Sequence, residues 1–193
     1  MAKAELRREL GGRLAALEPE RACAAAARAA ARALGVPELA RAGRVLACLS
    51  FGSELDTWPL VERLLEAGRE VFVPRADPRD GLLHVHRYPC PLETLSFGLR
   101  QPPRGTPELA PEAIDATLDA VLVLGLAFDR RGFRLGHGRG YFDRFFARHR
   151  VPGVGLAYDW QLLDRLPAEP HDEPMRVVVT EAAVVRPDAG PRA

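Results

Sequence analysis

One stretch of the chain places glycines at three alternate positions, Gly136, Gly138 and Gly140, between two arginines. Glycine has no Cβ, so it can adopt positive φ and lets a ligand approach the backbone closely. The N–H groups of such a stretch, with those of a following helix, can bind an anion. Arg134 and Arg139 add positive charge suited to phosphate oxygens. We call residues 134–143 the glycine loop and predict that it binds phosphate.

The acid at the end of the glycine loop, Asp143, falls in the first turn of a helix predicted from Tyr141 to Arg150. A carboxylate repels phosphates unless a divalent cation lies between them, so the pattern favours a nucleotide triphosphate and a metal-binding aspartate. No Gly-Lys-Ser/Thr follows the glycines, and their spacing differs from that of dinucleotide-binding loops. The alternative is a flexible surface loop with solvated arginines, in which Asp143 only stabilises the helix dipole.

The lead-in to the loop makes the pattern more specific. The segment from Gly125 to Asp129, then Gly132, then the glycine loop through Arg144 resembles the signature of 5-formyltetrahydrofolate cyclo-ligases, also called 5,10-methenyltetrahydrofolate synthetases. Weaker matches follow the same order from Lys3 to about Glu181. They are Lys3 and Arg7, Glu54 within 53–57, Val73-Pro74-Arg75, 96–99, 157–161 and Asp172. Gln101 and Phe142 depart from the family, which has an acid and, in many members, a second tyrosine there.

The resemblance implies an enzyme that converts 5-formyltetrahydrofolate, including polyglutamylated forms, and ATP to 5,10-methenyltetrahydrofolate, ADP and phosphate, with Mg²⁺ as cofactor. It assigns catalysis to Arg134, Tyr141 and Asp143, and metal binding to Asp143 and Asp172. The implied ATP-binding residues are Lys3, Ala4, Glu5, Leu6, Arg7, Arg134, Leu135, Gly136, His137, Gly138, Arg139, Gly140, Tyr141 and Phe142. The implied folate-binding residues are Leu49, Glu54, His137, Gly138, Arg139, Gly140 and Tyr141.

Several of these roles have plainer alternatives. Glu54 suits a pterin, because a carboxylate can accept two hydrogen bonds from its N–H edge, but helix capping would explain Glu54 as well. Asp56 is interpreted as a cap. Arg75 could meet a phosphate or the glutamate tail of folate. Two other functions stay open: a non-catalytic regulator that binds folate or nucleotide, and a sugar-phosphate isomerase or transferase.

The elements that must position these residues follow a strand–loop–helix–strand order between residues 45 and 73, which predicts a βαβ unit and a parallel sheet. Leu49 and Glu54 follow the first of these strands, where α/β sheets bind ligands. We expect a single three-layer α/β domain over residues 1–184, with a mostly parallel open sheet, helices on both faces, and a flexible tail over 185–193. The predicted helices are 3–17, 21–34, 58–67 and 141–150, and the predicted strands 45–49, 69–73, 83–87, 119–128, 154–158 and 175–180.

The composition supports one domain with a sizeable core, because 47% of the 193 residues are apolar. A net charge of +1 gives no field that would attract nucleic acid or an acidic membrane. Three widely spaced cysteines fit reduced thiols better than a disulfide framework. We therefore expect a cytoplasmic monomer whose partners are the folate and ATP, with neither nucleic acid nor membrane among them.

Overall fold

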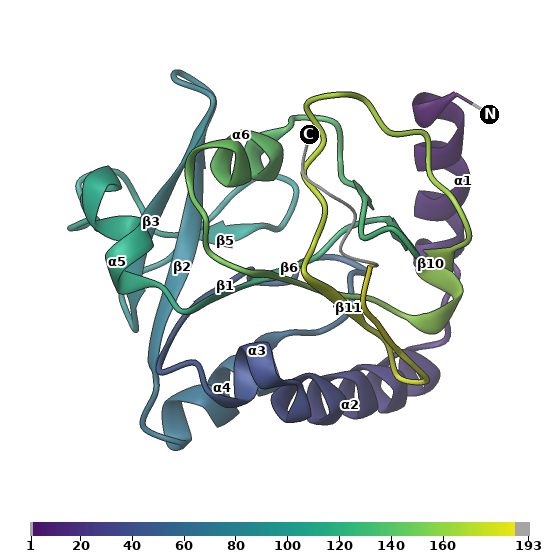
Figure 1. Ribbon diagram of the computed structural model, residues 1–193, viewed down its shortest axis with the longest axis horizontal. Coiled ribbons are helices and arrows are strands. Elements are labelled where there is room, and N and C mark those ends of the chain that lie inside the picture. The colour runs from purple at the N-terminus through teal and green to yellow at the C-terminus, as the bar shows by residue number, and fades with distance from the viewer. Residues whose placement is uncertain (1, 188–193) are drawn as a thin grey trace.

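The computed structural model describes residues 2–187 of the chain and is built around a seven-stranded sheet with the order β12-β11-β9-β6-β1-β2-β3 (Figure 1). Neighbouring strands from β11 to β2 run parallel, and the two edge strands are antiparallel to their neighbours. The mostly parallel open sheet is thereby confirmed. The strands are β1 Arg44–Ala47, β2 Glu70–Asp77, β3 Leu82–Tyr88, β6 Ala120–Val123, β9 Gly153–Leu156, β11 Val177–Val179 and β12 Val184–Val185.

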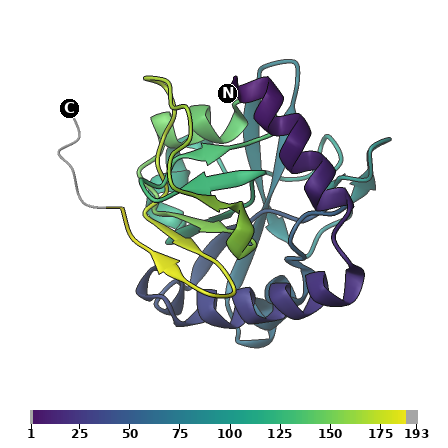
Figure 2. The ribbon, with the colours of Figure 1, turned by 90° about the vertical axis from the view of Figure 1, so that its right-hand side faces the viewer.

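Buried side chains along the parallel strands alternate between the two faces of the sheet, because successive strand residues point in opposite directions. The core is therefore divided into two layers. Ala120 and Leu122 of β6 pack in one apolar cluster, whereas Val121 and Val123 pack in the other. Helices cover both faces, as predicted (Figures 1 and 2). The first cluster includes residues of α1 Lys3–Ala15, α2 Pro19–Gly35, α3 Pro37–Ala40 and α4 Trp58–Glu66, and the second includes residues of α5 Ile114–Thr117 and α6 Tyr141–Arg148.

The N-terminal helix α1 crosses the side of the sheet (Figure 2), and its leucines explain this position. Leu6, Leu10 and Leu14 recur every four residues, so they share one face and are buried. Lys3 and Arg7 lie on a neighbouring face of the same helix. Packing of the leucines therefore directs the two basic side chains toward the residues that follow the sheet's strands.

The prediction of one continuous strand over residues 119–128 is wrong, because the chain leaves the main sheet in the middle of this segment. β6 ends at Val123, and β7, Ala127–Asp129, belongs to a separate small sheet with β8, Arg134–Leu135, and β10, Leu162–Leu163. The amide of Gln161 donates to the carbonyls of Gly125 and Leu126, both at 3.0 Å, and so satisfies backbone groups that have left the main sheet. The break lets β7 pair with β8, whose two residues are the first two of the glycine loop.

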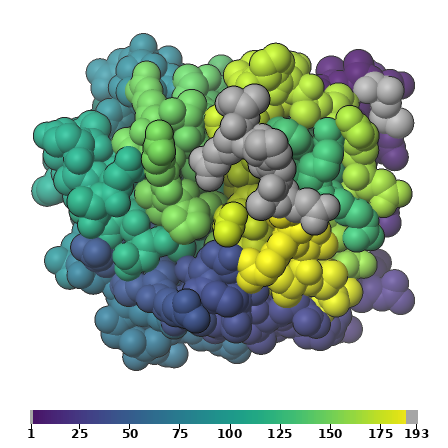
Figure 3. Space-filling view, viewed as in Figure 1, coloured from purple at the N-terminus to yellow at the C-terminus, as the bar shows by residue number. Residues whose placement is uncertain are grey.

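The remaining elements are short. β4, Glu93–Thr94, and β5, Arg100–Gln101, form a two-stranded sheet of their own. Two 3₁₀ turns span Pro111–Ala113 and Asp159–Gln161. Residues 181–187 lie against α2 and α3 on the surface (Figure 3), where Arg186 pairs with Glu38. The predicted mobility of residues 185–193 stays a prediction, as does the one-domain division, and residues 188–193 lie outside the described part. Within residues 2–187 no helix has the length and apolar character needed to cross a membrane.

A stability prediction follows from how tightly β9 packs. A Cβ on Gly155 would lie 2.6 Å from Cε1 of the buried Phe128 ring. We expect Gly155→Ala to lower the free energy of unfolding by roughly 1–3 kcal/mol, because overpacking forces neighbours to shift. Gly12→Ala in α1 is the matched control, since its Cβ would meet nothing within 4 Å, and it should stabilise by about 0.5–1 kcal/mol. Urea unfolding measures both; equal stability of Gly155→Ala and wild type would contradict the packing.

Candidate active site

A cavity of about 890 Å³ opens beyond the carboxyl ends of β1 and β6. Cys48 and Leu124, the residues just after these strand ends, form part of its wall, with Leu49 beside them. This is the position at which parallel α/β sheets bind ligands. Besides Leu124, six stretches of chain surround the cavity: α1, residues 48–54, residues 74–83, residues 95–101 of the β4–β5 hairpin, the glycine loop and residues 169–172.

The glycine loop forms one side of the cavity, and all of its residues from 134 to 143 line it. Gly138 and Gly140 have φ of 94° and 64°, a region that side chains disfavour; Gly136 does not use positive φ. Gly140 is also the N-cap of α6. Among the described residues, the N–H groups of residues 137–143 have no protein hydrogen-bond acceptor. Consecutive free N–H groups at a helix N-terminus form a site for an anion.

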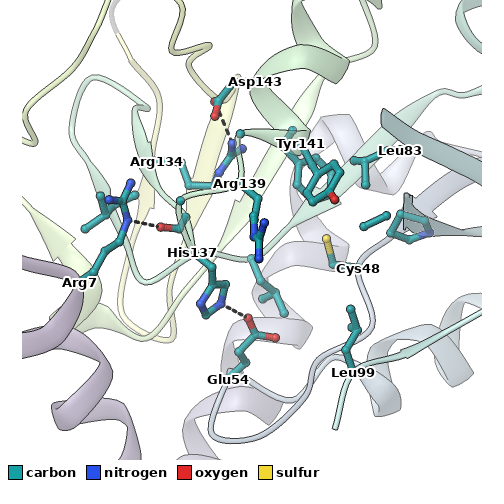
Figure 4. Close-up of a pocket in the computed structure, with 18 of the residues that line it drawn as sticks. Arg7, Cys48, Glu54, Leu83, Leu99, Arg134, His137, Arg139, Tyr141 and Asp143 are labelled. Atoms are coloured by element: carbon teal, nitrogen blue, oxygen red, sulfur yellow. Dashed lines mark hydrogen bonds and ion pairs between the residues drawn. The ribbon is translucent and has the colours of Figure 1, made fainter. Parts of the chain in front are cut away.

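Arg134 lies at the base of the loop and pairs with Asp143, with 2.9 Å between Nη2 and Oδ1 (Figure 4). The Arg134 side chain is only 4% exposed. Burial lowers its pKa, and the charge of Asp143 opposes that shift. Its Nη1 is buried without a hydrogen-bond partner among the described residues. A buried guanidinium with a spare donor beside a cavity is suited to an anionic ligand that enters there.

Two basic residues of α1 also line the cavity, and one of them contacts the glycine loop. Arg7 donates from Nε to the carbonyl of Gly136 at 2.9 Å (Figure 4). Lys3 lies 2.7 Å from Asp172 and 3.2 Å from Glu169. Burial on its own would lower the pKa of Lys3, but hydrogen bonds and charge from the two carboxylates raise it above the ordinary value. The same pairing lowers the pKa of Asp172, against the effect of burial.

Glu54 and His137 of the glycine loop face each other, with 3.0 Å between Oε1 and Nε2 (Figure 4). Glu54 is 12% exposed at its side chain, and its other oxygen accepts from the N–H of Phe51. It therefore does not cap α4. Asp56 lies one residue before the N-cap Thr57, and its Oδ1 accepts from the N–H of Trp58, the first residue of α4, at 3.0 Å, which fits the predicted capping role.

The structure brings most of the predicted site residues to the cavity and leaves three out. Glu5 is exposed on α1 outside the cavity wall, and Leu6 packs in the core. Arg75 is buried and pairs with Asp77 at 3.0 Å, so it does not extend to a ligand in the cavity. The reason is that β2 continues to Asp77. Pro74 and Ala76 face the cavity, and the alternating Arg75 faces away.

The two predicted metal ligands, Asp143 and Asp172, both line the cavity. One oxygen of each is engaged, by Arg134 and by Lys3, and carboxylate oxygens are the hard donors that Mg²⁺ prefers. Within residues 2–187, the three-residue cluster with metal-ligand spacing is a different one, Asp77, Asp80 and His84. Asp77 is already paired with arginines there, including Arg75 and Arg79.

Sequence reasoning missed several lining residues. Phe97 and Arg100, on the β4–β5 hairpin, reach the cavity although the departure at Gln101 put this turn in doubt. Glu169 pairs with Lys3, and its position three residues before Asp172 was an available signal. Cys48 also lines the cavity, but burial raises its pKa to about 12, which disfavours the reactive thiolate form.

An open α/β sheet with free loop N–H groups and clustered cations at its carboxyl edge is typical of the class of proteins whose sites suit phosphorylated or otherwise anionic ligands. A model of the 5-formyltetrahydrofolate cyclo-ligase family matches residues 1–181. The chain belongs to this family and is an enzyme of the ligase class.

Individual members of the family are similar to this chain over most of its length. It is 34% identical over 175 residues to the 5-formyltetrahydrofolate cyclo-ligase of Escherichia coli K12, covering 88% of this chain and 94% of that one. It is 38% identical over 143 residues to the Mycolicibacterium smegmatis protein of the same name, with coverage of 70% and 72%. The solved structure of Aquifex aeolicus 5,10-methenyltetrahydrofolate synthetase superposes with a TM-score of 0.81 at 30% identity, covering 100% of this chain and 96% of that one.

Proposed function

We propose that the chain cyclises 5-formyltetrahydrofolate to 5,10-methenyltetrahydrofolate, with ATP as co-substrate, Mg²⁺ as cofactor, and ADP and phosphate as products. The observation that carries this proposal is the run of free N–H groups at residues 137–143, set in one cavity with Arg134 and Glu54. The N–H groups would bind phosphate, Arg134 would supply positive charge, and Glu54 would accept hydrogen bonds from the pterin ring.

The chemistry needs alignment more than a protein nucleophile. The formyl oxygen at N5 is a poor leaving group, and N10 is a weak nucleophile. Attack of the formyl oxygen on the γ-phosphorus forms an O–P bond and releases ADP. N10 then forms a bond to the formyl carbon and gives up its proton to solvent, and loss of the phosphorylated oxygen as phosphate leaves the methenyl bridge. The protein must hold the oxygen in line with the γ-phosphate and offset developing charge.

The glycine loop and α1 would hold the triphosphate. N–H groups of residues 137–143 and the free Nη1 of Arg134 would bind phosphate oxygens, and Lys3 and Arg7 would do so after exchanging their present acceptors. Asp143 and Asp172 would hold Mg²⁺, which supplies positive charge that offsets the phosphates. Leu49, Glu54, His137 and Tyr141 would hold the folate, with Glu54 accepting from the pterin N–H edge.

The test is the absorbance of the methenyl product when the purified chain is given 5-formyltetrahydrofolate with and without MgATP. The proposal requires product that depends on ATP. Binding of folate or nucleotide without product would instead indicate a regulator, and sugar-phosphate turnover without ATP would indicate an isomerase or transferase.

We also propose that the protein is a cytoplasmic monomer without nucleic acid or membrane partners. The three free thiols support the cytoplasmic location, because cysteines stay reduced there.

Glu54→Gln is expected to weaken folate binding roughly tenfold to a hundredfold, because an unpaired buried donor costs about 1–3 kcal/mol. Glutamine places a donor where the pterin N–H groups need an acceptor, whereas the phosphates would be bound by backbone N–H groups and basic side chains that the substitution leaves in place. Separate titrations with folate and with ATP measure the difference. Asp56→Asn, a cap two residues away, is the control and should leave both affinities unchanged. Equal losses for folate and ATP in Glu54→Gln would assign Glu54 to folding.

Lys3 is expected to acylate more slowly when MgATP is bound. It is the only lysine of the chain, so an amine-directed reagent can modify only Lys3 and the terminal amine. Reaction should already be slow without ATP, because the raised pKa leaves less free amine. Acylation removes the charge and should raise the KM for ATP, and Lys3→Arg should be partly tolerated. If MgATP changes neither the acylation rate nor the KM of the acylated enzyme, Lys3 is outside the ATP site.

A further inference from the structure

Arg144, in the first half of α6, joins two turns that are far apart in sequence. Its Nε donates to the carbonyl of Gly81 at 2.7 Å, in the turn between β2 and β3, and its Nη2 donates to the carbonyl of Arg139 at 2.8 Å, in the glycine loop. Its guanidinium also lies 5.3 Å from the centre of the Tyr141 ring. Figure 1 shows α6 beside the β2–β3 hairpin, which this side chain connects to the loop.

Glycines on both sides let the guanidinium fit. Gly140 and Gly81 have φ of 64° and 73°. A Cβ on Gly140 would lie 3.0 Å from Nη1 of Arg144, and a Cβ on Gly81 would lie 3.4 Å from Nη2. The side chain is thus seated between two glycine turns whose backbones it contacts directly. This close fit is specific to a flat, forked donor group.

The contact with Arg139 sets the direction of one loop peptide. The Arg139–Gly140 peptide is trans, so the Gly140 N–H points opposite to the Arg139 carbonyl. Arg139 and Gly140 line the cavity, whereas Arg144 and Gly81 do not. Because the carbonyl is turned outward to Arg144, the N–H is turned toward the cavity. Without this anchor the peptide could rotate, and its carbonyl would then repel a phosphate from the same place.

We propose that Arg144 is a positioning residue of the phosphate site. It touches no ligand itself. It acts through the Arg139 carbonyl, which aims the Gly140 N–H into the cavity. The inference rests on the proposed ATP site and adds to it a residue that anchors the loop to the β2–β3 turn.

The test compares Arg144→Ala and Arg144→Lys with Arg148→Ala. Arg148 is an exposed arginine one turn further along α6, without a hydrogen bond or ion pair from its side chain within residues 2–187. We expect Arg144→Ala to raise both the KM and the calorimetric Kd for ATP about tenfold, with the KM for folate and the Tm near wild type, because one charge-assisted contact is lost. Arg144→Lys should recover part of the loss, since one donor remains for one of the two carbonyls. Arg148→Ala should match wild type.

The outcomes separate this inference from the proposed function. Unchanged ATP affinity in Arg144→Ala, or equal weakening of ATP and folate, overturns the role of Arg144 while wild-type turnover still supports the function. If the wild type binds ATP but forms no methenyl product, the function fails and the binding series still decides on Arg144. If the wild type does not bind ATP, both fall.

Discussion

Asp143→Ala is expected to lower ATP-dependent turnover by ~10²–10³-fold, the loss that follows removal of one electrostatic group from an active site. Asp143 is the acid of the glycine loop, lines the cavity and pairs with the buried Arg134 at 2.9 Å. Its removal takes away both a proposed Mg²⁺ ligand and the partner that orients Arg134. Initial rates of methenyl formation at limiting Mg²⁺ measure the effect.

Asp143→Asn separates the two contributions. Asparagine keeps a neutral oxygen that can accept from Arg134, so it should restore stability relative to Asp143→Ala, yet it is a poor Mg²⁺ ligand and should stay inactive. Asp164→Ala, an exposed acid paired with Arg130, is the control and should keep full activity. Near-normal turnover of Asp143→Ala at limiting Mg²⁺ would show that Asp143 is only a helix-dipole acid.

Asp129→Ala is expected to cost about 3–5 kcal/mol of unfolding free energy, because several donors lose their acceptor and each buried donor left unpaired costs about 1–3 kcal/mol. Asp129 is 0% exposed at its side chain. Its Oδ1 accepts from the N–H groups of Arg131 and Phe133, and its Oδ2 from the N–H of Leu166 and the guanidinium of Arg131. These bonds close the turn that leads from β7 into β8 and the glycine loop.

Urea unfolding measures the loss, and Asp164→Ala again serves as the control, since exposed substitutions usually change stability by no more than about 0.5 kcal/mol. Asp129→Asn should fall between alanine and wild type, because one oxygen remains while the new amide faces donors. A loss below about 1 kcal/mol in Asp129→Ala would show that the turn closes without the carboxylate.

The fold could be predicted from the sequence where the signal is local. The order of strand, loop, helix and strand between residues 45 and 73 predicts parallel pairing of β1 and β2, and this is confirmed. The break in the strand predicted over 119–128 could not be predicted, because it depends on Gln161. That side chain lies 36 and 35 residues from the two carbonyls it binds.

In the candidate site, too, local features could be predicted from the sequence and contacts between distant segments could not. The glycine loop is a continuous segment, so its residue types alone indicated phosphate binding. The contacts of Arg7 with Gly136 and of Glu54 with His137 join segments 129 and 83 residues apart. Only the fold brings such pairs together. Arg75 was misplaced because the strand was expected to end at Val73. In the longer β2, alternation turns its side chain away from the cavity.

The most direct measurement uses 5-formyltetrahydrofolate labelled with ¹⁸O at the formyl oxygen. The purified chain and MgATP are added, the methenyl product is followed by absorbance, and the released phosphate is analysed by mass. Phosphorylation of the formyl oxygen predicts product only with ATP, and one phosphate carrying one ¹⁸O for each methenyl formed. Product that forms without ATP, or ¹⁸O that appears in water while the phosphate stays unlabelled, would contradict transfer of the γ-phosphate to that oxygen.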